Sequence, residues 1–346
     1  MTPDAVTPGA DPADPADTIE GRADGKGRRP VLAGLGVTLA VLSVAACRPV
    51  QPFGVSPASG RWSSVAGLNI PRDDFGLTAV GGRLFAIGGM TGARGNALDS
   101  VEVFDPSSAS WSRAGRLGAP TSSLGAATLH ERVYAVGGAR DDLEVPLNWV
   151  WSPGPVSQSR ATAWESAAPL LQPRLGHGLA ALSGRLYVAG GLHRGEATAT
   201  MEAYDPQRDR WSAVAPLPEP RFNLGLVALG GRLYAIGGSG TDRRPAASLF
   251  HYDPVADRWR TGTSMPEALS NFGVAPLGDR RIHALHHRTH LVFDATPERW
   301  LRATPMPTSR HGLGLIVLAG ALYAIGGCSE EPQRDLPTVE VFRPAV

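Results

Sequence analysis

Histidines are the first residues in this sequence whose type and spacing suggest chemistry. Four of the nine histidines fall in the segment Arg280–His290, which reads RRIHALHHRTH. Imidazole is a common metal ligand, and His287 and His290 are expected to face each other across a tight hairpin. Two histidines leave a transition-metal site incomplete, and the spacing supplies no third ligand. The sequence therefore predicts no metal, with His287 and His290 as the only candidate ligands.

A recurring arginine is the second feature that suggests chemistry. It stands four residues before a glycine that opens a repeated apolar segment, at Arg72, Arg174, Arg221 and Arg310, whereas two further copies carry Thr121 and Leu269. Guanidinium groups suit bidentate binding of a carboxylate or another oxyanion. His177 and His311 lie beside two of these arginines. Each is either a candidate acid or base near neutral pH or only a polar residue of the channel rim. These six Arg and His residues are the candidate ligand-binding set.

The elements that must position these residues repeat along the chain. The segments GLTAVGGRLFAIGG at Gly76 and GLVALGGRLYAIGG at Gly225 are two of several related copies. Each copy predicts two short buried strands ending in a Gly-Gly pair, then a third strand such as VEVFDP, then a fourth strand that begins at a Trp. Such a sheet cannot bury its faces alone, so the copies must pack against one another. Radial packing protects the strand edges and predicts a β-propeller.

These residues resemble the kelch repeat, through the Gly-Gly doublet, the aromatic residue before it and the spaced Trp. The resemblance covers about residues 60–346 and implies an all-β, six-bladed propeller of four-stranded antiparallel blades. The last copy ends in VEVFRPAV with no Trp strand, whereas Trp62 has a strand with no copy before it. We therefore expect the N-terminal Trp62 strand to join the last blade and close the ring.

The propeller would gather the candidate residues at one mouth of its channel, on the face that carries the variable loops. In many kelch repeats, however, an arginine at this position braces adjacent blades through backbone carbonyls. Glu102, Glu202 and Glu340 recur in the third strands, and recurrence favours an architectural role. The histidine-rich stretch becomes the second strand of a divergent fifth copy, with His283 in place of Tyr or Phe. Its loop shrinks to Arg288-Thr289, which lowers the channel rim on that side.

The composition excludes several function classes. Lys and Arg number 33 against 32 Asp and Glu, without a basic block in the bulk of the chain, so nucleic acid is not an expected partner. Walker-type, Rossmann, G-x-S-x-G and H-E-x-x-H patterns are absent from suitable contexts, so no cofactor is expected.

The N-terminal region resembles a bacterial export signal. Residues 1–30 form a polar leader, and residues 31–47 hold an apolar run of secretory length that ends in VAAC. This box resembles that of lipoproteins, which implies lipid attachment at Cys47, a tether over 48–59 and a membrane-anchored protein facing the periplasm or cell exterior. The alternatives are an uncleaved anchor or a signal cut elsewhere. "RRPVL" also resembles a twin-arginine signal, and Cys328 is left unpaired.

Two function classes fit these features. The first is an extracytoplasmic binding or scaffold protein that recognises a protein or carbohydrate through the loop face and channel mouth, without catalysis. The second is a sugar-acid isomerase, because the chain resembles the sialic-acid mutarotase type of kelch propeller in size, blade number and export. Its candidate residues are Arg174, Arg221, Glu144 and Glu196, which no spacing singles out. A copper-radical site of the galactose oxidase type is not expected, because Cys328 is its only matching residue.

Overall fold

The structure is a computed structural model that describes residues 60–92, 95–140, 150–153, 164–330 and 332–345. The leader, the signal region with Cys47, the tether and Glu144 lie outside these residues and stay predictions from the sequence. Contacts divide the chain into Met1–Val50 and Gln51–Val346, and the description below concerns the second unit. Within the described residues, no helix has the length and apolarity needed to cross a membrane.

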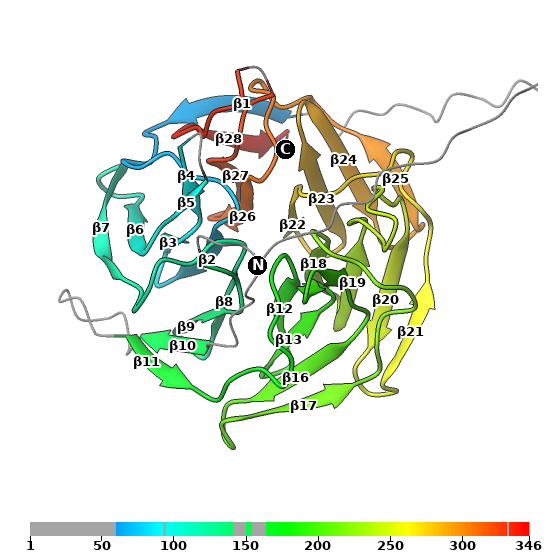
Figure 1. Ribbon diagram of the computed structural model, residues 1–346. Helices are drawn as coiled ribbons and strands as arrows, with labels where there is room; N and C mark the ends of the chain where they lie inside the picture. The colour runs from blue at the N-terminus through cyan, green and yellow to red at the C-terminus, as the bar shows by residue number, and fades with distance from the viewer. Residues whose placement is uncertain (1–59, 93–94, 141–149, 154–163, 331, 346) are drawn as a thin grey trace, which may run out of the picture. The chain divides into compact units, whose positions relative to one another are not determined.

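The described strands form an all-β propeller of four-stranded antiparallel blades, as the repeat predicts (Figure 1). Six such sheets are present among them. From the innermost strand outward, they are β2 (Gly76–Val80), β3 (Arg83–Ile87), β6 (Ser100–Asp105) and β7 (Ser110–Arg116); β8 (Gly125–Leu129), β9 (Arg132–Val136), β10 (Val150–Pro153) and β11 (Trp164–Ala167); β12 (Gly178–Leu182), β13 (Arg185–Ala189), β16 (Met201–Asp205) and β17 (Arg210–Val214); β18 (Gly225–Leu229), β19 (Arg232–Ile236), β20 (Leu249–Asp253) and β21 (Arg258–Thr261); β22 (Gly273–Leu277), β23 (Arg281–His286), β24 (Thr289–Asp294) and β25 (Arg299–Arg302); and β26 (Gly314–Leu318), β27 (Ala321–Ile325), β28 (Val339–Pro344) and β1 (Gly60–Val65).

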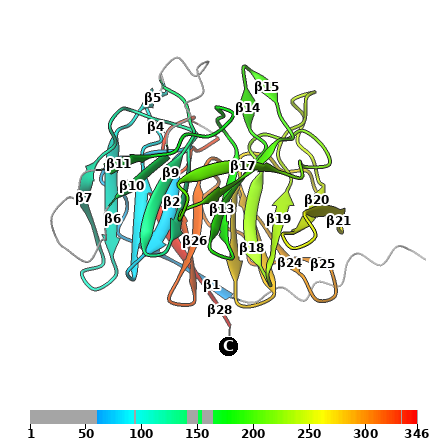
Figure 2. The ribbon, with the colours of Figure 1, turned by 90° about the horizontal axis from the view of Figure 1, so that it is seen from below.

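Two short hairpins rise from the loops that follow the second strands. They are β4 (Met90–Thr91) with β5 (Asn96–Ala97), and β14 (Leu192–His193) with β15 (Glu196–Ala197). Both stand on the same face of the propeller, called here the loop face (Figure 2). The innermost strands begin at this face, so residues just before each innermost strand lie beside the loops.

The core lies between neighbouring sheets. Second strands such as β3 are buried at every position after the first, because both faces of the sheet are covered. Five tryptophans near the start of outer strands add a polar link between sheets. Indole Nε1 donates to a main-chain carbonyl that follows the outer strand of the preceding sheet, at 2.8–3.1 Å, from Trp62, Trp111, Trp211, Trp259 and Trp300. A buried indole N–H needs such a partner, and here the partner fixes blade against blade.

Closure of the ring follows the predicted route. Strand β1 pairs with β28 along its whole length, with Trp62 opposite Phe342. The Trp62 ring packs on Phe342 with 5.2 Å between centroids and donates to Thr304 O in the neighbouring sheet. The last sheet is therefore built from residues at both ends of the propeller sequence.

A belt of main-chain hydrogen bonds surrounds the channel at the loop face. Two residues before each innermost strand, one amide N donates to the carbonyl of the equivalent residue in the preceding sheet, and six such bonds of 2.6–3.1 Å form a closed circuit. All six residues have φ between 46° and 60°. They are Asp74, Ser123, Gly176, Asn223, Asn271 and Gly312. Left-handed backbone is tolerated best by Gly, Asn and Asp, which explains five of these six residue types.

We predict that Trp62→Ala lowers the free energy of unfolding by about 2–3 kcal/mol, since it removes packing on Phe342 and the indole bond to Thr304. Urea denaturation of the full-length chain measures this change. Trp62→Phe is the matched control, because it retains most of the packing and should cost about 1 kcal/mol. A loss for Trp62→Ala within about 0.5 kcal/mol of zero would contradict the closing role of this strand.

Candidate functional site

The divergent fifth sheet leaves an opening at the loop face. In the other five sheets, a residue before the innermost strand pairs with one after the second strand, as Asp73 does with Met90 and His311 with Cys328. In the fifth sheet β23 and β24 are joined by a turn of two residues, His287 and Arg288, where the sequence predicted Arg288 and Thr289. His287 N instead donates to Arg310 O of the next sheet. The long loop that follows the second strand in the other sheets is therefore missing on this side, as the sequence predicted.

A cavity of about 720 Å³ occupies this opening. Its walls carry hydroxyl, amide and imidazole groups, with one carboxylate. They include Asn271, His286, His287, His311, Glu330 and Gln333. The segments come from the fifth and last sheets and from the belt, so the shortened hairpin and the ring together shape the cavity.

Three imidazoles meet inside the cavity. Ring centroids of His286 and His287 lie 4.1 Å apart, and those of His287 and His311 lie 5.4 Å apart. His287 Nε2 lies 3.4 Å from the Glu330 carboxylate. Burial, with the neighbouring imidazoles His287 and His311, lowers the pKa of His286 to about 4, and burial lowers the pKa of His287 despite Glu330. His286 is therefore uncharged at neutral pH and offers one donor and one acceptor.

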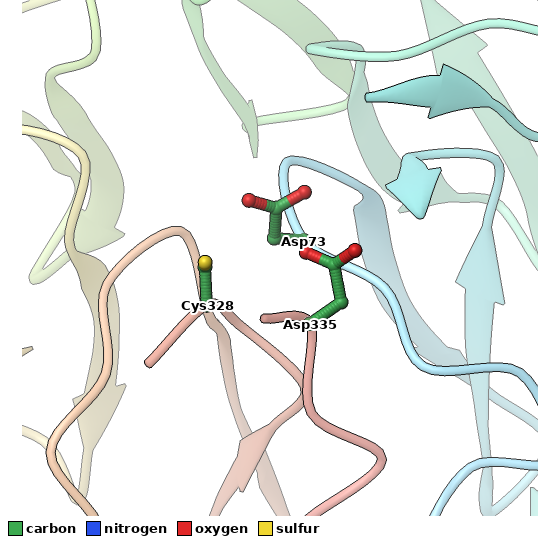
Figure 3. Close-up of side chains that lie close together, drawn as sticks. All are labelled: Asp73, Cys328 and Asp335. Atoms are coloured by element: carbon green, nitrogen blue, oxygen red, sulfur yellow. The ribbon is translucent and has the colours of Figure 1, made fainter. Parts of the chain in front are cut away.

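A second group of polar side chains lies next to this cavity, where the first and last sheets meet. Ligand atoms of Asp73, Cys328 and Asp335 lie within 4.8 Å of one another (Figure 3). Burial and the like charges of Asp74 and Asp335 raise the pKa of Asp73 to about 8. This group could not be predicted from the sequence, because Asp73 is 255 residues from Cys328 and no motif joins them.

The structure corrects the predicted ring of ligand-binding arginines. Side chains of Arg72, Arg174 and Arg310 are 0% exposed and form ion pairs of 2.6–2.9 Å with glutamates of the third strands. The glutamates are Glu102, Glu202 and Glu340, in the same order. These guanidinium groups do not face the channel mouth, because their N–H groups donate to carboxylates and main-chain carbonyls inside the blade.

Each pair anchors the segment that enters its blade. Arg174 donates to Gly190 O and Thr200 O, while Glu202 accepts from the backbone amides of Leu171 and Gln172. Arg72 and Glu102 make the matching bonds in the first sheet, to Gly88 O and from Ile70 N. The arginine thus braces main-chain carbonyls within a blade, and the glutamate holds the connection from the preceding one.

The pairing explains which copies have lost the arginine. Thr121 and Leu269 stand at the arginine position of the second and fifth sheets, where register places Trp151 and Leu291 at the glutamate position. Arginine and glutamate are therefore absent together in these two sheets. Comparing copies across both positions would have identified the pair from sequence.

Arg221 is the exception to this pairing. Its sheet has Phe250 at the glutamate position, opposite Ala235. Its guanidinium bonds instead to Glu219, to Pro220 O and to Ser248 Oγ, and its side chain is 12% exposed. Arg221 does not line the cavity at the fifth sheet.

The predicted histidines divide into two groups. His311 lines the cavity at the fifth sheet, and its role in ligand binding stays a prediction. His177 is 8% exposed, and burial followed by the charge of Arg174 lowers its pKa to about 3. At neutral pH its imidazole is thus a neutral packing residue rather than an acid.

The predicted pairing of His287 with His290 is wrong. His290 lies opposite Leu285, points into the core and is 2% exposed, whereas His287 faces Glu330. His290 Nδ1 bonds to Thr304 O at 2.9 Å, so it carries the proton, and Nε2 accepts from His283 Nδ1 at 2.8 Å. These two core imidazoles form a neutral hydrogen-bonded chain.

We predict that Glu202→Leu lowers the free energy of unfolding by about 3–5 kcal/mol, because Arg174 is left buried without its counter-ion. The double variant Arg174→Leu/Glu202→Leu reproduces the Leu269 and Leu291 pair of the fifth sheet, and should recover at least half of the loss. Equilibrium unfolding of both variants measures the coupling. Glu219→Leu is the exposed control and should cost less than about 1 kcal/mol. A double variant less stable than Glu202→Leu would contradict the bracing role.

We also predict that the core imidazoles make the fold acid-sensitive. Burial lowers the pKa of His283 to about 3 and of His290 to about 4, against about 6.5 in the unfolded chain. The unfolded state binds more protons below pH about 6.5, so each histidine removes about 1.4 kcal/mol of stability per pH unit as pH falls toward 4. Asp73 acts in the opposite sense, so the comparison uses His283→Phe. Urea midpoints at pH 7.5 and 5 should differ less in that variant; equal differences would contradict the assignment.

Comparison with known proteins gives a family match and a structural match. A family model described as the KLHDC2/KLHL20/DRC7 Kelch-repeats domain matches residues 74–282. The solved structure of YjhT superposes with a TM-score of 0.67 at 12% identity, and the match covers 79% of this chain and 95% of that one. At this identity the likeness shows the fold alone. No curated protein matches the chain significantly.

Proposed function

The chain belongs to the kelch-repeat family, and from this premise we propose that it is a binding module whose ligand enters the cavity at the fifth sheet. Kelch propellers host many functions on one scaffold, so the proposal rests on the site rather than on the fold. The supporting observation is the cavity of about 720 Å³, which has the size of a small-molecule site. Its position at the shortened hairpin leaves it accessible from the loop face.

The chemistry of the walls favours an uncharged polyhydroxylated ligand. Ser270, Asn271, Ser309 and Gln333 supply neutral hydroxyl and amide groups, and His286 is a neutral imidazole at pH 7. Such groups match sugar hydroxyls, which both donate and accept hydrogen bonds. We infer that the ligand is a neutral carbohydrate.

The cavity disfavours a sugar acid, which was the alternative from sequence. Its charged wall group, Glu330, would repel a carboxylate, and none of its lining residues is an arginine. Arg174 is 0% exposed and bound to Glu202, and Glu196 lies in the β14–β15 hairpin. The described candidates for a mutarotase reaction are therefore not assembled around one pocket.

The place of action follows from the sequence alone. We propose that the propeller is held outside the cytoplasm by a lipid on Cys47, as the VAAC box suggests. A soluble or surface glycan would then reach the loop face without crossing a membrane.

We predict that neutral oligosaccharides raise the melting temperature of the full-length chain in a thermal-shift screen, whereas sialic and uronic acids do not. Gln333→Ala and His311→Ala should each raise the Kd of the best ligand at least about tenfold, because each removes a hydrogen-bond partner. Gln207→Ala, at an exposed turn between β16 and β17, is the control and should bind normally.

Three results would count against this proposal. They are a screen without any neutral-glycan response, a response equally reduced by Gln207→Ala, or a response to sugar acids that persists in Gln333→Ala and His311→Ala. Binding only to a protein would assign the cavity to protein recognition.

A further inference from the structure

Three potential ligand atoms gather at the seam where the propeller closes. Asp73 comes from the segment that enters the first sheet, and Cys328 and Asp335 come from the loop between β27 and β28 of the last sheet. One carboxylate oxygen from each aspartate and the Cys328 Sγ lie within 4.8 Å of one another, and the side chains come from two neighbouring loops (Figure 3). These three residues are called the seam cluster below.

One carboxylate oxygen of the seam cluster, Asp73 Oδ1, is buried without a hydrogen-bond partner. Asp73 is 8% exposed. No ion pair between described residues includes Asp73 or Asp335. A buried carboxylate oxygen without donor or cation is costly, so this atom itself points to a missing ligand.

The backbone holds the seam cluster in place. Asp73 exchanges two main-chain hydrogen bonds with Met90, and Cys328 exchanges two with His311, at 2.8–3.1 Å. Asp335 pairs with Cys328, and its Oδ2 accepts from Gly92 N at 2.6 Å. Preorganised ligands of this kind lose little entropy when they bind an ion.

We propose that the seam cluster binds a zinc ion. Calcium and magnesium prefer oxygen ligands alone, whereas zinc accepts thiolate and carboxylate ligands together. In a tetrahedral zinc site, ligand atoms lie about 3.3–3.8 Å apart, so the three ligand atoms need to approach one another by at most about 1.5 Å. Three protein ligands leave the fourth position to water.

The zinc ion would join the first and last sheets across the seam. Shared coordination by side chains of both sheets would couple metal binding to closure of the ring. His311 connects this site to the cavity, since its backbone pairs with Cys328 and its ring lines the cavity. The inference does not depend on the proposed glycan ligand.

Zinc titration of the full-length chain tests this site. The protein carries Cys47→Ser and no affinity tag, so Cys328 is its single thiol. Calorimetry of the metal-stripped protein should show one equivalent of zinc, with an increase in melting temperature. Cobalt as a probe should give a thiolate-to-metal charge-transfer band in the near ultraviolet. Zinc should protect Cys328 from iodoacetamide.

Substitutions inside and outside the seam cluster test whether the zinc ion binds there. Cys328→Ser and Asp335→Asn should each weaken zinc affinity at least about tenfold. Asp242→Asn, in an exposed loop on the same face, and His287→Ala, in the imidazole cluster, should leave it unchanged. Thiol protection is measured on the parent chain, so the test holds even where a variant folds poorly.

Several outcomes would overturn the zinc site. They are no saturable binding near one equivalent, no thiolate band with cobalt, or affinity lost in His287→Ala but retained in Cys328→Ser. Glycan binding is measured separately with a chelator present. Failure of the zinc site and failure of the glycan proposal are therefore distinguishable.

Discussion

The belt of six main-chain hydrogen bonds is the constraint on which the loop face depends. Each residue of the belt both donates to one neighbouring sheet and accepts from the other, so the circuit has no free end. A displacement of one blade would have to lengthen two bonds or move all the others. The left-handed backbone at these positions turns the chain from the linker into the innermost strand. The same turn sets Asp73, Ser270 and His311 beside the loops.

Buried ion pairs add a second level of organisation outside the belt. Three arginines carry charge into the blades, which is unfavourable unless each is neutralised and fully hydrogen-bonded. The glutamates neutralise these charges, and Glu102 and Glu202 also accept backbone amides of the entering segments, as Glu202 does from Leu171. Three sheets do without the pair. Two of them carry Thr121 or Leu269 at the arginine position, and the fourth sheet has Phe250 at the glutamate position. Charge is therefore used here to fix connections rather than to attract a ligand.

The strands and the closure of the ring could be predicted from the sequence, whereas the site could not. The repeat predicted the strands, because strands follow local patterns. The last copy lacks a Trp strand and the Trp62 strand lacks a copy, and this match predicted the pairing of β1 with β28. The arginine ring was wrong, because a recurring residue shows a shared environment without saying whether that environment is open. The cavity depends on the His287–Arg288 turn, which brings His286 toward His311 and His287 toward Glu330. The seam cluster depends on register between loops of unequal length, which composition and spacing do not encode.

Pairing of β1 with β28 has a consequence for the order of folding. Ser63 and Arg343 are hydrogen-bonded neighbours separated by 280 residues in sequence. During synthesis the outer strand of the last sheet emerges first and its partner emerges last, so β1 must wait as an unpaired edge. Contacts of such high sequence separation form slowly, and exposed edges invite pairing with other chains. The propeller is therefore most prone to misassembly just before β28, the partner of β1, has been synthesised.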